Sequence, residues 1–202
     1  GNAIGAGKRE EARLIAARGI CFGLIISLLL MVAAWFAGPE LIKLVSTEGA
    51  YRDAGTQYFM FLILALPAFV MSFGLNGLLQ SQGDTVSMQR AQIAAFFANI
   101  ALNPVLVFGF PGIWDGIGFN GIAVSTVLSQ TGVMIYVAYR LMQTDLMDGV
   151  TRSCFRPEKK TYIDITKQML PVTMTMFVMM SAGFIVQFYL KSFGTAAVAA
   201  YG

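Results

Sequence analysis

Two asparagines, Asn99 and Asn103, lie four residues apart in a long uncharged stretch of the chain. In a helix, residues at this spacing share one face. Their amide oxygens could bind a cation or accept a hydrogen bond from an amine, and their amide N–H groups could hold a chain of water. The simpler alternative is that they join neighbouring helices, as Asn, Ser and Thr commonly do in apolar bundles. We favour a cavity role for this pair.

Other uncharged polar residues occur in similar stretches on either side of the pair. Asn76 precedes it and is a weaker candidate for the same cavity. A second polar group follows it, whose members are Ser125, Thr126, Ser129, Gln130 and Thr131. For Ser125 and Ser129 we expect mainly hydrogen bonds between helices. Pro67 lies inside an apolar run and predicts a kink, either for packing or as a hinge beside a cavity.

Several kinds of chemistry are disfavoured by the composition. The chain has no His, the commonest metal ligand and proton shuttle. Its two cysteines, Cys21 and Cys154, lie in different settings and do not suggest a disulfide framework. A membrane enzyme would need clustered His, Asp or Glu, and no such cluster is evident. We therefore expect no catalytic residue, no metal site and no cofactor apart from a coupling ion.

The polar residues must be positioned by membrane-spanning helices. Five stretches of more than twenty residues lack any charged side chain, namely 19–39, 54–83, 91–114, 116–139 and 168–190. At about 1.5 Å per residue, each can cross a hydrocarbon core about 30 Å thick. None alternates in polarity as barrel strands do. Only 12% of the residues are charged and 56% are hydrophobic. The sequence thus predicts an all-α integral membrane protein, a polytopic bundle with five transmembrane helices here.

The basic residues predict the orientation of these helices. If the segment before the first helix is cytoplasmic, the outside loops hold only Lys43, Arg52 and Lys191. The inside loops then hold eleven cations: Lys8, Arg9, Arg13, Arg18, Arg90, Arg140, Arg152, Arg156, Lys159, Lys160 and Lys167. This is the positive-inside pattern. It makes the lipid bilayer, and not nucleic acid, the expected partner of a chain with pI near 9.0.

The connections between the helices carry further expectations. We expect a loop at 38–54 with Pro39 and Gly49 as helix breakers, and an irregular glycine-rich turn at 109–121. Pro157 is expected to open a short surface helix within the basic connection 140–167. The chain begins without Met in what reads as a loop, so we expect a piece of a longer protein.

An ordered series of motifs resembles the multidrug and toxic compound extrusion (MATE) family along the whole chain. The series comprises segment 5–12 before a helix, Gln82-Gly83-Asp84-Thr85, Asn99 with Asn103, segment 121–126 with Ser129-Gln130, Leu170-Pro171 and segment 194–201. The ordered spacing is more specific than any single motif.

The resemblance implies a twelve-helix transporter of two lobes that exports organic cations or other amphipathic compounds in exchange for Na⁺ or H⁺. Such a protein lies in the bacterial cytoplasmic membrane. The five helices would be the family's third to seventh: residues 1–160 would belong to the amino-terminal lobe, and 161–202 would begin the second. The remaining helices of the full-length chain would then be its partners.

The resemblance also implies that Asn99, Asn103 and Thr126 line an ion or proton site of the amino-terminal lobe. This sequence departs from many prokaryotic members, which carry Asp at the position of Asn103. Proton coupling through this residue is therefore not expected, and coupling could rest on helices outside the chain. An alternative function is a flippase for lipid-linked oligosaccharides or polysaccharides from a related superfamily. The lack of Arg or Lys at the expected cavity positions disfavours an anionic lipid pyrophosphate as cargo.

Overall fold

The computed structural model describes residues 2–45, 50–110 and 112–194. Five of its helices are long and apolar enough to cross a membrane, which confirms the predicted helix count. In chain order the elements are α1 (Asn2–Gly5), α2 (Arg9–Val45), α3 (Ala50–Ser81), α4 (Ser87–Phe108), β1 (Gly109–Phe110), β2 (Trp114–Asp115), α5 (Asn120–Met142), η1 (Arg152–Phe155), α6 (Lys159–Leu190) and η2 (Lys191–Phe193).

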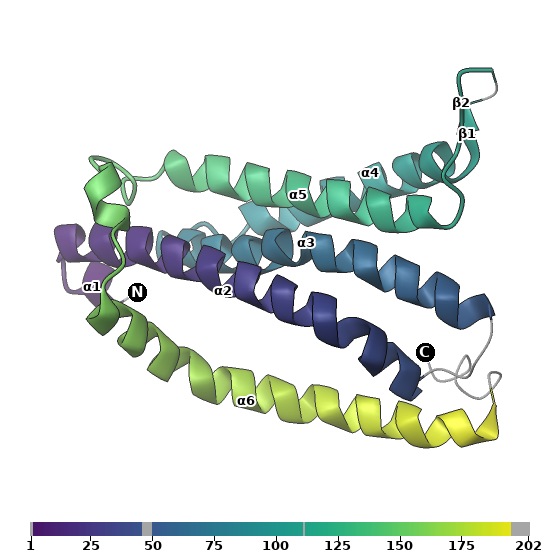
Figure 1. Cartoon of the computed structure of the whole chain (residues 1–202). Coiled ribbons are helices and arrows are strands. Elements are labelled where there is room, and N and C mark those ends of the chain that lie inside the picture. The colour runs from purple at the N-terminus through teal and green to yellow at the C-terminus, as the bar shows by residue number, and fades with distance from the viewer. Residues whose placement is uncertain (1, 46–49, 111, 195–202) are drawn as a thin grey trace.

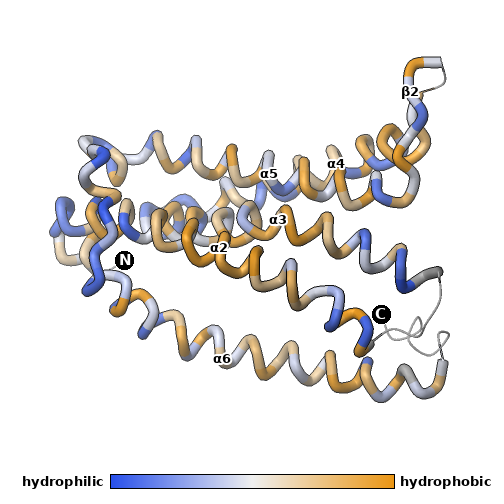
Figure 2. The backbone as a smooth tube through the Cα atoms, viewed as in Figure 1, coloured by the Kyte–Doolittle hydropathy of each residue, from blue (hydrophilic) through white to orange (hydrophobic). Residues whose placement is uncertain are grey.

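The helices α2 to α5 form a bundle in which α3 and α5 are the inner helices. α3 packs between α2 and α5, and α4 packs on the other side of α5, so the order across the bundle is α2, α3, α5, α4. Figure 1 shows α6 apart from this bundle and beside α2. In Figure 2 the middles of the helices are mainly hydrophobic and their ends more hydrophilic, as membrane-spanning segments require.

The glycine-rich connection between α4 and α5 is more regular than expected. α4 ends at Phe108 and α5 begins at Asn120, so the predicted spans 91–114 and 116–139 were too long at this side. Between them β1 and β2 pair as an antiparallel hairpin. Gly109 has φ 76°, a conformation that ends the helix and that side chains other than hydrogen disfavour. A charge-free window could not reveal this reversal, because the hairpin is itself almost uncharged.

Two helices continue where the sequence predicted breaks. α2 runs through Pro39 to Val45, and an ion pair of 2.7 Å between Lys43 and Glu40 lies on its last turns. Gly49, the other expected breaker, lies outside the described residues. α6 begins at Lys159 and runs without interruption to Leu190, so the short surface helix expected after Pro157 is wrong. In α2, Pro39 removes only one backbone hydrogen bond, which is too little to end a helix in an apolar setting.

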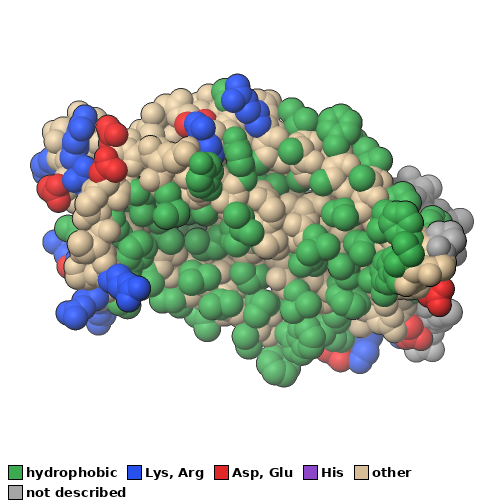
Figure 3. Space-filling view, turned by 90° about the horizontal axis from the view of Figure 1, so that it is seen from above, with side chains coloured by type: hydrophobic (Ala, Val, Ile, Leu, Met, Phe, Trp, Pro, Cys, Tyr) green, Lys and Arg blue, Asp and Glu red, His purple; other side chains and the backbone are tan. Residues whose placement is uncertain are grey.

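The best-packed part of the bundle lies at the end where α2 and α4 begin. Its buried cluster joins four helices and includes Ala16, Leu75, Leu79, Val137 and Leu141. We call this end the basic end, because it carries Lys8, Arg9, Arg13, Arg18, Arg90 and Arg140. Figure 3, which looks down on α4 and α5, shows hydrophobic side chains over most of this face and most of the Lys and Arg toward one end.

α6 touches the bundle mainly near its own start. Arg18 on α2 forms an ion pair with Glu158, immediately before α6, and the rings of Phe22 and Tyr162 lie 4.9 Å apart. Farther along, every side chain from 166 to 180 is exposed. The described part of the chain therefore leaves most of α6 uncovered. The division into lobes at residue 160 remains a prediction.

Candidate functional site

The central pair of the candidate site lies on one face of α4. The Asn103 Nδ2 group donates a hydrogen bond of 2.9 Å to the Asn99 Oδ1 atom, one turn earlier. Pro104 follows directly and lies inside the helix without ending it. The shared face predicted from the spacing is thus present, and the two amides are held in fixed orientations relative to each other.

Ser125 of α5 connects this pair to the neighbouring helix. Its hydroxyl donates to the Asn103 Oδ1 atom and also lies 2.9 Å from the carbonyl oxygen of Ile122. The Ser125 side chain is fully buried. The expectation of an interhelical hydrogen bond at Ser125 is therefore confirmed. Both ends of the Asn103 amide are used, one toward Asn99 and one toward α5.

A glycine allows the two helices to approach closely at this level. Gly121 lies one turn before Ser125, and a Cβ atom added to it would lie 2.7 Å from the carbonyl carbon of Leu106 on α4. Any side chain here would press on backbone, which cannot move away as a flexible side chain can. The close approach of α4 and α5 therefore depends on Gly121.

A polar groove of about 260 Å³ runs between α4 and α5 beside this contact. It is lined by Gln92, Ala95, Phe96, Asn99, Ile100, Thr126, Ser129 and Gln130. The Thr126 hydroxyl donates 3.0 Å to the carbonyl of Ile122 on its own helix, so its oxygen remains available only as an acceptor. The structure thus brings Thr126 and Asn99 to one groove. Asn103 is not among the residues that line the groove, but it forms a hydrogen bond with Asn99.

Two further oxygens of this groove were not singled out as site atoms from the sequence. The Ser129 Oγ and Gln130 Oε1 atoms are buried and have no hydrogen-bond partner among the described residues. Buried polar atoms are costly unless they have a partner, so these two oxygens are available to bind water, an ion or a ligand group. The signal in the sequence was the polar run 125–131, but which of its members face the groove depends on the rotation of α5.

Asn76 and Pro67 lie on α3, away from this hydrogen-bond network. The Asn76 Oδ1 atom is buried and unpartnered within the described residues, and Asn76 does not line the polar groove. α3 runs unbroken through Pro67. The cavity role of Asn76 and the hinge role of Pro67 remain predictions.

The groove offers neutral oxygen and nitrogen atoms. Its lining contains amide and hydroxyl side chains but no Asp, Glu, Lys or Arg. Across the described ranges, no group of three His, Cys, Asp or Glu side chains converges as a metal site would require. Neutral oxygens of this kind can coordinate a hard cation such as Na⁺ or accept a hydrogen bond from a guest. They do not exchange protons near neutral pH.

The basic end is held by charged contacts around the loop between α3 and α4. Asp84 accepts hydrogen bonds from the Ser87 backbone N–H at 2.9 Å and the Ser87 hydroxyl at 2.6 Å, and Arg140 donates to it at 3.2 Å. These bonds, with those from Ser87 the strongest, lower the pKa of the Asp84 carboxyl to about 2. Asp84 is therefore a carboxylate near the start of α4, where its negative charge interacts favourably with the positive end of the helix dipole.

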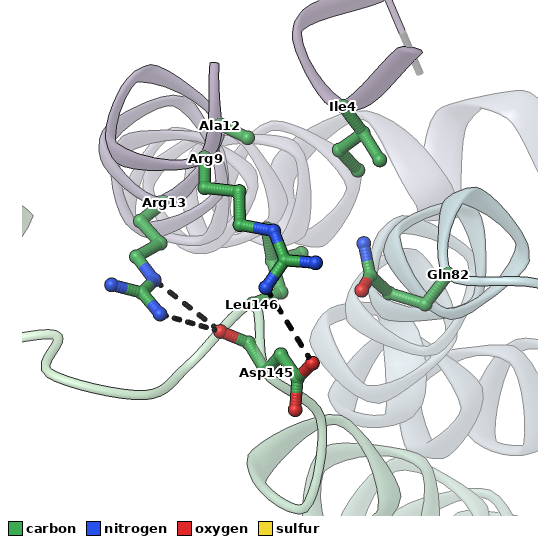
Figure 4. A pocket seen from close by; sticks show the side chains of 7 residues that line it. All are labelled: Ile4, Arg9, Ala12, Arg13, Gln82, Asp145 and Leu146. Atoms are coloured by element: carbon green, nitrogen blue, oxygen red, sulfur yellow. Dashed lines mark hydrogen bonds and ion pairs between the residues drawn. The ribbon is translucent and has the colours of Figure 1, made fainter. Parts of the chain in front are cut away.

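A small pocket of about 70 Å³ lies at the same end (Figure 4). Arg9 points to the Asp145 carboxylate at 4.0 Å, and the Nε and Nη2 groups of Arg13 donate to the Asp145 carbonyl at 3.3 and 3.2 Å. Gln82 faces these groups from the end of α3. The pocket is small and its charges are paired, so we interpret it as a joint between α2 and the segment after α5.

Comparison with known protein families identifies the chain. The MatE family model matches residues 1–105, which is more than half of the chain. The chain belongs to the MatE family. This confirms the family to which the sequence motifs pointed.

Relatives of this MatE chain include bacterial export proteins. "Multidrug export protein MepA" of Staphylococcus saprophyticus is 24% identical over 98% of the chain, and that of Staphylococcus aureus strain RF122 is 21% identical over the same share. The chain spans 43% of the length of each of these relatives.

A solved structure has the same fold as this MatE chain. It is described as an inward-facing conformation of a multidrug resistance MATE family transporter of the MOP superfamily. The match has a TM-score of 0.78 at 24% identity and covers 95% of this chain and 42% of the other. The two chains therefore share the same overall fold across nearly all of this chain.

Proposed function

We propose that the protein containing this chain is a secondary active transporter that exports organic cations or other amphipathic compounds in exchange for Na⁺ or H⁺. The observation that carries the proposal is the groove between α4 and α5. There, neutral amide and hydroxyl oxygens gather inside the membrane-spanning part of the bundle, and two of them are buried without a partner among the described residues. Polar groups at this depth are costly and typically mark an ion or substrate pathway.

The relatives support transport as the function. They are named multidrug export proteins, and the structure with the same fold is that of a multidrug resistance transporter. Phe96 adds an aromatic face to the groove, and such a face attracts organic cations. A drug-sized cation could therefore meet both acceptor oxygens and an aromatic ring here. No chemical transformation is assigned to the protein.

Alternating access between two lobes is the mechanism that we propose. The amino-terminal lobe would contain residues 1–160, and α6 would begin the second lobe. The weak contact of α6 with the bundle beyond its first turns supports two bodies that move relative to each other. The coupling ion must bind the inward and outward states with different affinity, since equal affinity shifts no equilibrium.

The groove itself is better suited to binding a cation through oxygen than to carrying a proton. Asn99, Thr126 and Gln130 supply neutral oxygens, and Asn103 orients the first of them. If H⁺ is the coupling ion, the titrating group would lie on helices beyond this chain. The protein would reside in the bacterial cytoplasmic membrane with its basic end inside, following the charge asymmetry.

The proposal is tested with the full-length protein in proteoliposomes. Efflux of a fluorescent organic cation is measured under a Na⁺ gradient and, separately, under a pH gradient, for the wild type and for Asn103→Ala. The variant removes the hydrogen bonds to Asn99 and Ser125, so we expect one gradient to drive efflux and the variant to slow it about tenfold, equivalent to about 1.4 kcal/mol.

Asn120→Ala is the matched control, because Asn120 lies at the start of α5, where its amide meets Gln57 at 3.4 Å and not the groove. Its efflux should stay near that of the wild type. If neither gradient drives efflux of any cation in a panel, the antiporter proposal is overturned and the flippase alternative is favoured. Equal losses in both variants would remove Asn103 from the site.

A further inference from the structure

A second groove lies between α4 and α5 and differs from the polar one in its chemistry. It has a volume of about 490 Å³ and is lined mainly by Ala91, Ala94, Ala98, Leu102, Leu128 and Val133. The two grooves share Ala95 and Ser129, so they flank the line along which the helices meet. Asn99 and Thr126 face the polar groove, and this second groove is almost entirely apolar. We call it the alanine groove.

A free cation marks one end of the alanine groove. Arg90 lines it at the basic end and is exposed. Within the described ranges its guanidinium makes no ion pair and no hydrogen bond, whereas Arg9, Arg13, Arg18 and Arg140 all have partners. Asp84, the nearby carboxylate in the sequence, is already occupied by Ser87 and Arg140. Arg90 therefore lacks a counter-charge from the described chain.

The length of the alanine groove fits one leaflet of a bilayer. From Ala91 to Leu102 the helix rises about 16 Å at about 1.5 Å per residue. This is about half of a hydrocarbon core about 30 Å thick. A groove of this length begins at the headgroup level beside Arg90 and ends near the middle of the membrane. It matches a single acyl chain in both extent and polarity.

We propose that the alanine groove binds an anionic phospholipid from the leaflet at the basic end. The lipid phosphate contacts the Arg90 guanidinium, which can form two parallel hydrogen bonds to it. One acyl chain lies along Ala91, Ala94 and Ala98, where the small side chains leave room for it. Charge complementarity favours this occupant over another apolar helix, which would fill the groove but leave the Arg90 charge without a partner.

Native mass spectrometry of the purified full-length protein tests the proposal. Phosphatidylglycerol and phosphatidylcholine with identical acyl chains are titrated against the wild type, Arg90→Ala and Ala98→Phe. The wild type should retain the anionic lipid preferentially. Arg90→Ala should weaken this binding about fivefold, since one basic residue near an anionic headgroup contributes that much. Ala98→Phe should lower binding of the anionic lipid without removing a charge.

Arg156→Ala is the control, because Arg156 is also an exposed cation near the basic end but lies outside the groove. It should bind the lipid as the wild type does. The proposal is overturned if the wild type holds both lipids equally, or if Arg156→Ala loses as much binding as Arg90→Ala. A photo-crosslinker at position 98 that reacts with another helix of the same protein, and not with lipid, also overturns it. If Ala98→Phe does not fold, the comparison of the two arginine variants decides.

Discussion

At the scale of single residues, the side chain of Asn103 links α4 to α5 through hydrogen bonds beside the candidate site. Its amide donates to Asn99 on its own helix and accepts from Ser125 on the next. An aspartate at this position could not donate to Asn99 once ionised. The asparagine thus fixes the orientation of Asn99 through a hydrogen bond that does not depend on pH.

The sequence predicted part of this arrangement. The four-residue spacing was enough to place Asn99 and Asn103 on one face of α4. It was not enough to show that Ser125 reaches Asn103, or that Ser129 and Gln130 face the polar groove. Those contacts depend on how α5 is rotated and shifted along α4, which no single-helix pattern contains.

Asp84 gives a residue-scale prediction on pH. Its pKa is lowered to about 2 in the folded protein, from an ordinary value of 3.8. A lowered folded-state pKa stabilises the protein above the ordinary value, and this stabilisation is lost as the pH falls from about 4 to about 2. We expect thermal unfolding of the full-length protein to show a falling midpoint across this range, and Asp84→Asn to flatten that fall.

Asp115→Asn provides the comparison for this experiment. Asp115 lies in β2, and its side chain forms no hydrogen bond or ion pair among the described residues. The acid dependence of this variant should match that of the wild type. An unchanged fall in Asp84→Asn would show that other groups are responsible.

At the scale of elements, the packing of α4 against α5 depends on the absence of a side chain at Gly121. In Gly121→Ala the new Cβ atom would lie 2.7 Å from the Leu106 carbonyl carbon, so the helices must separate. Overpacking of this kind typically costs about 1–3 kcal/mol. We expect a lower unfolding midpoint for the full-length variant in detergent, and slower efflux because the bond from Ser125 to Asn103 lengthens.

Gly77→Ala is the matched variant, because a Cβ atom at Gly77 on α3 meets nothing within 4 Å. Alanine favours helix over glycine, so its unfolding midpoint should stay the same or rise slightly. Equal destabilisation in both variants would refute the close-approach argument for Gly121.

The helices themselves were predictable, and their ends were less so. Long charge-free windows identified all five spans, because the cost of a charge in hydrocarbon is the dominant constraint on such segments. The charge-free windows wrongly included the hairpin after Phe108 in a helix. They also ended the first helix at Pro39, although α2 continues to Val45. Helix ends outside the hydrocarbon depend on backbone conformation, as at Gly109, and on local ion pairs, as at Lys43.

At the scale of the whole molecule, Arg18 and Glu158 join the bundle to the start of α6. If α6 opens the second lobe, this pair links the lobes at the basic end. Glu158→Arg places two like charges together, which should disturb the balance between inward and outward states and slow efflux about tenfold. Combining it with Arg18→Glu should restore most of the rate in the proteoliposome assay.

Glu11→Lys serves as the reference, because Glu11 in the first turn of α2 forms an exposed ion pair with Lys8, which lies just before the helix. Such surface pairs contribute little, so its efflux should be nearly normal. Failure of the double variant to recover would mean that Arg18 and Glu158 act separately.

The neutral character of the α4 and α5 network also bears on how the protein is made. A charged side chain at the centre of a helix opposes its entry into the bilayer by about 3 kcal/mol. α4 and α5 carry only amides and hydroxyls at the level where Asn103 meets Ser125. Each can therefore leave the translocon as a separate helix during synthesis. The hydrogen bonds that align the two helices then form later, within the lipid, as a step of assembly that does not depend on insertion.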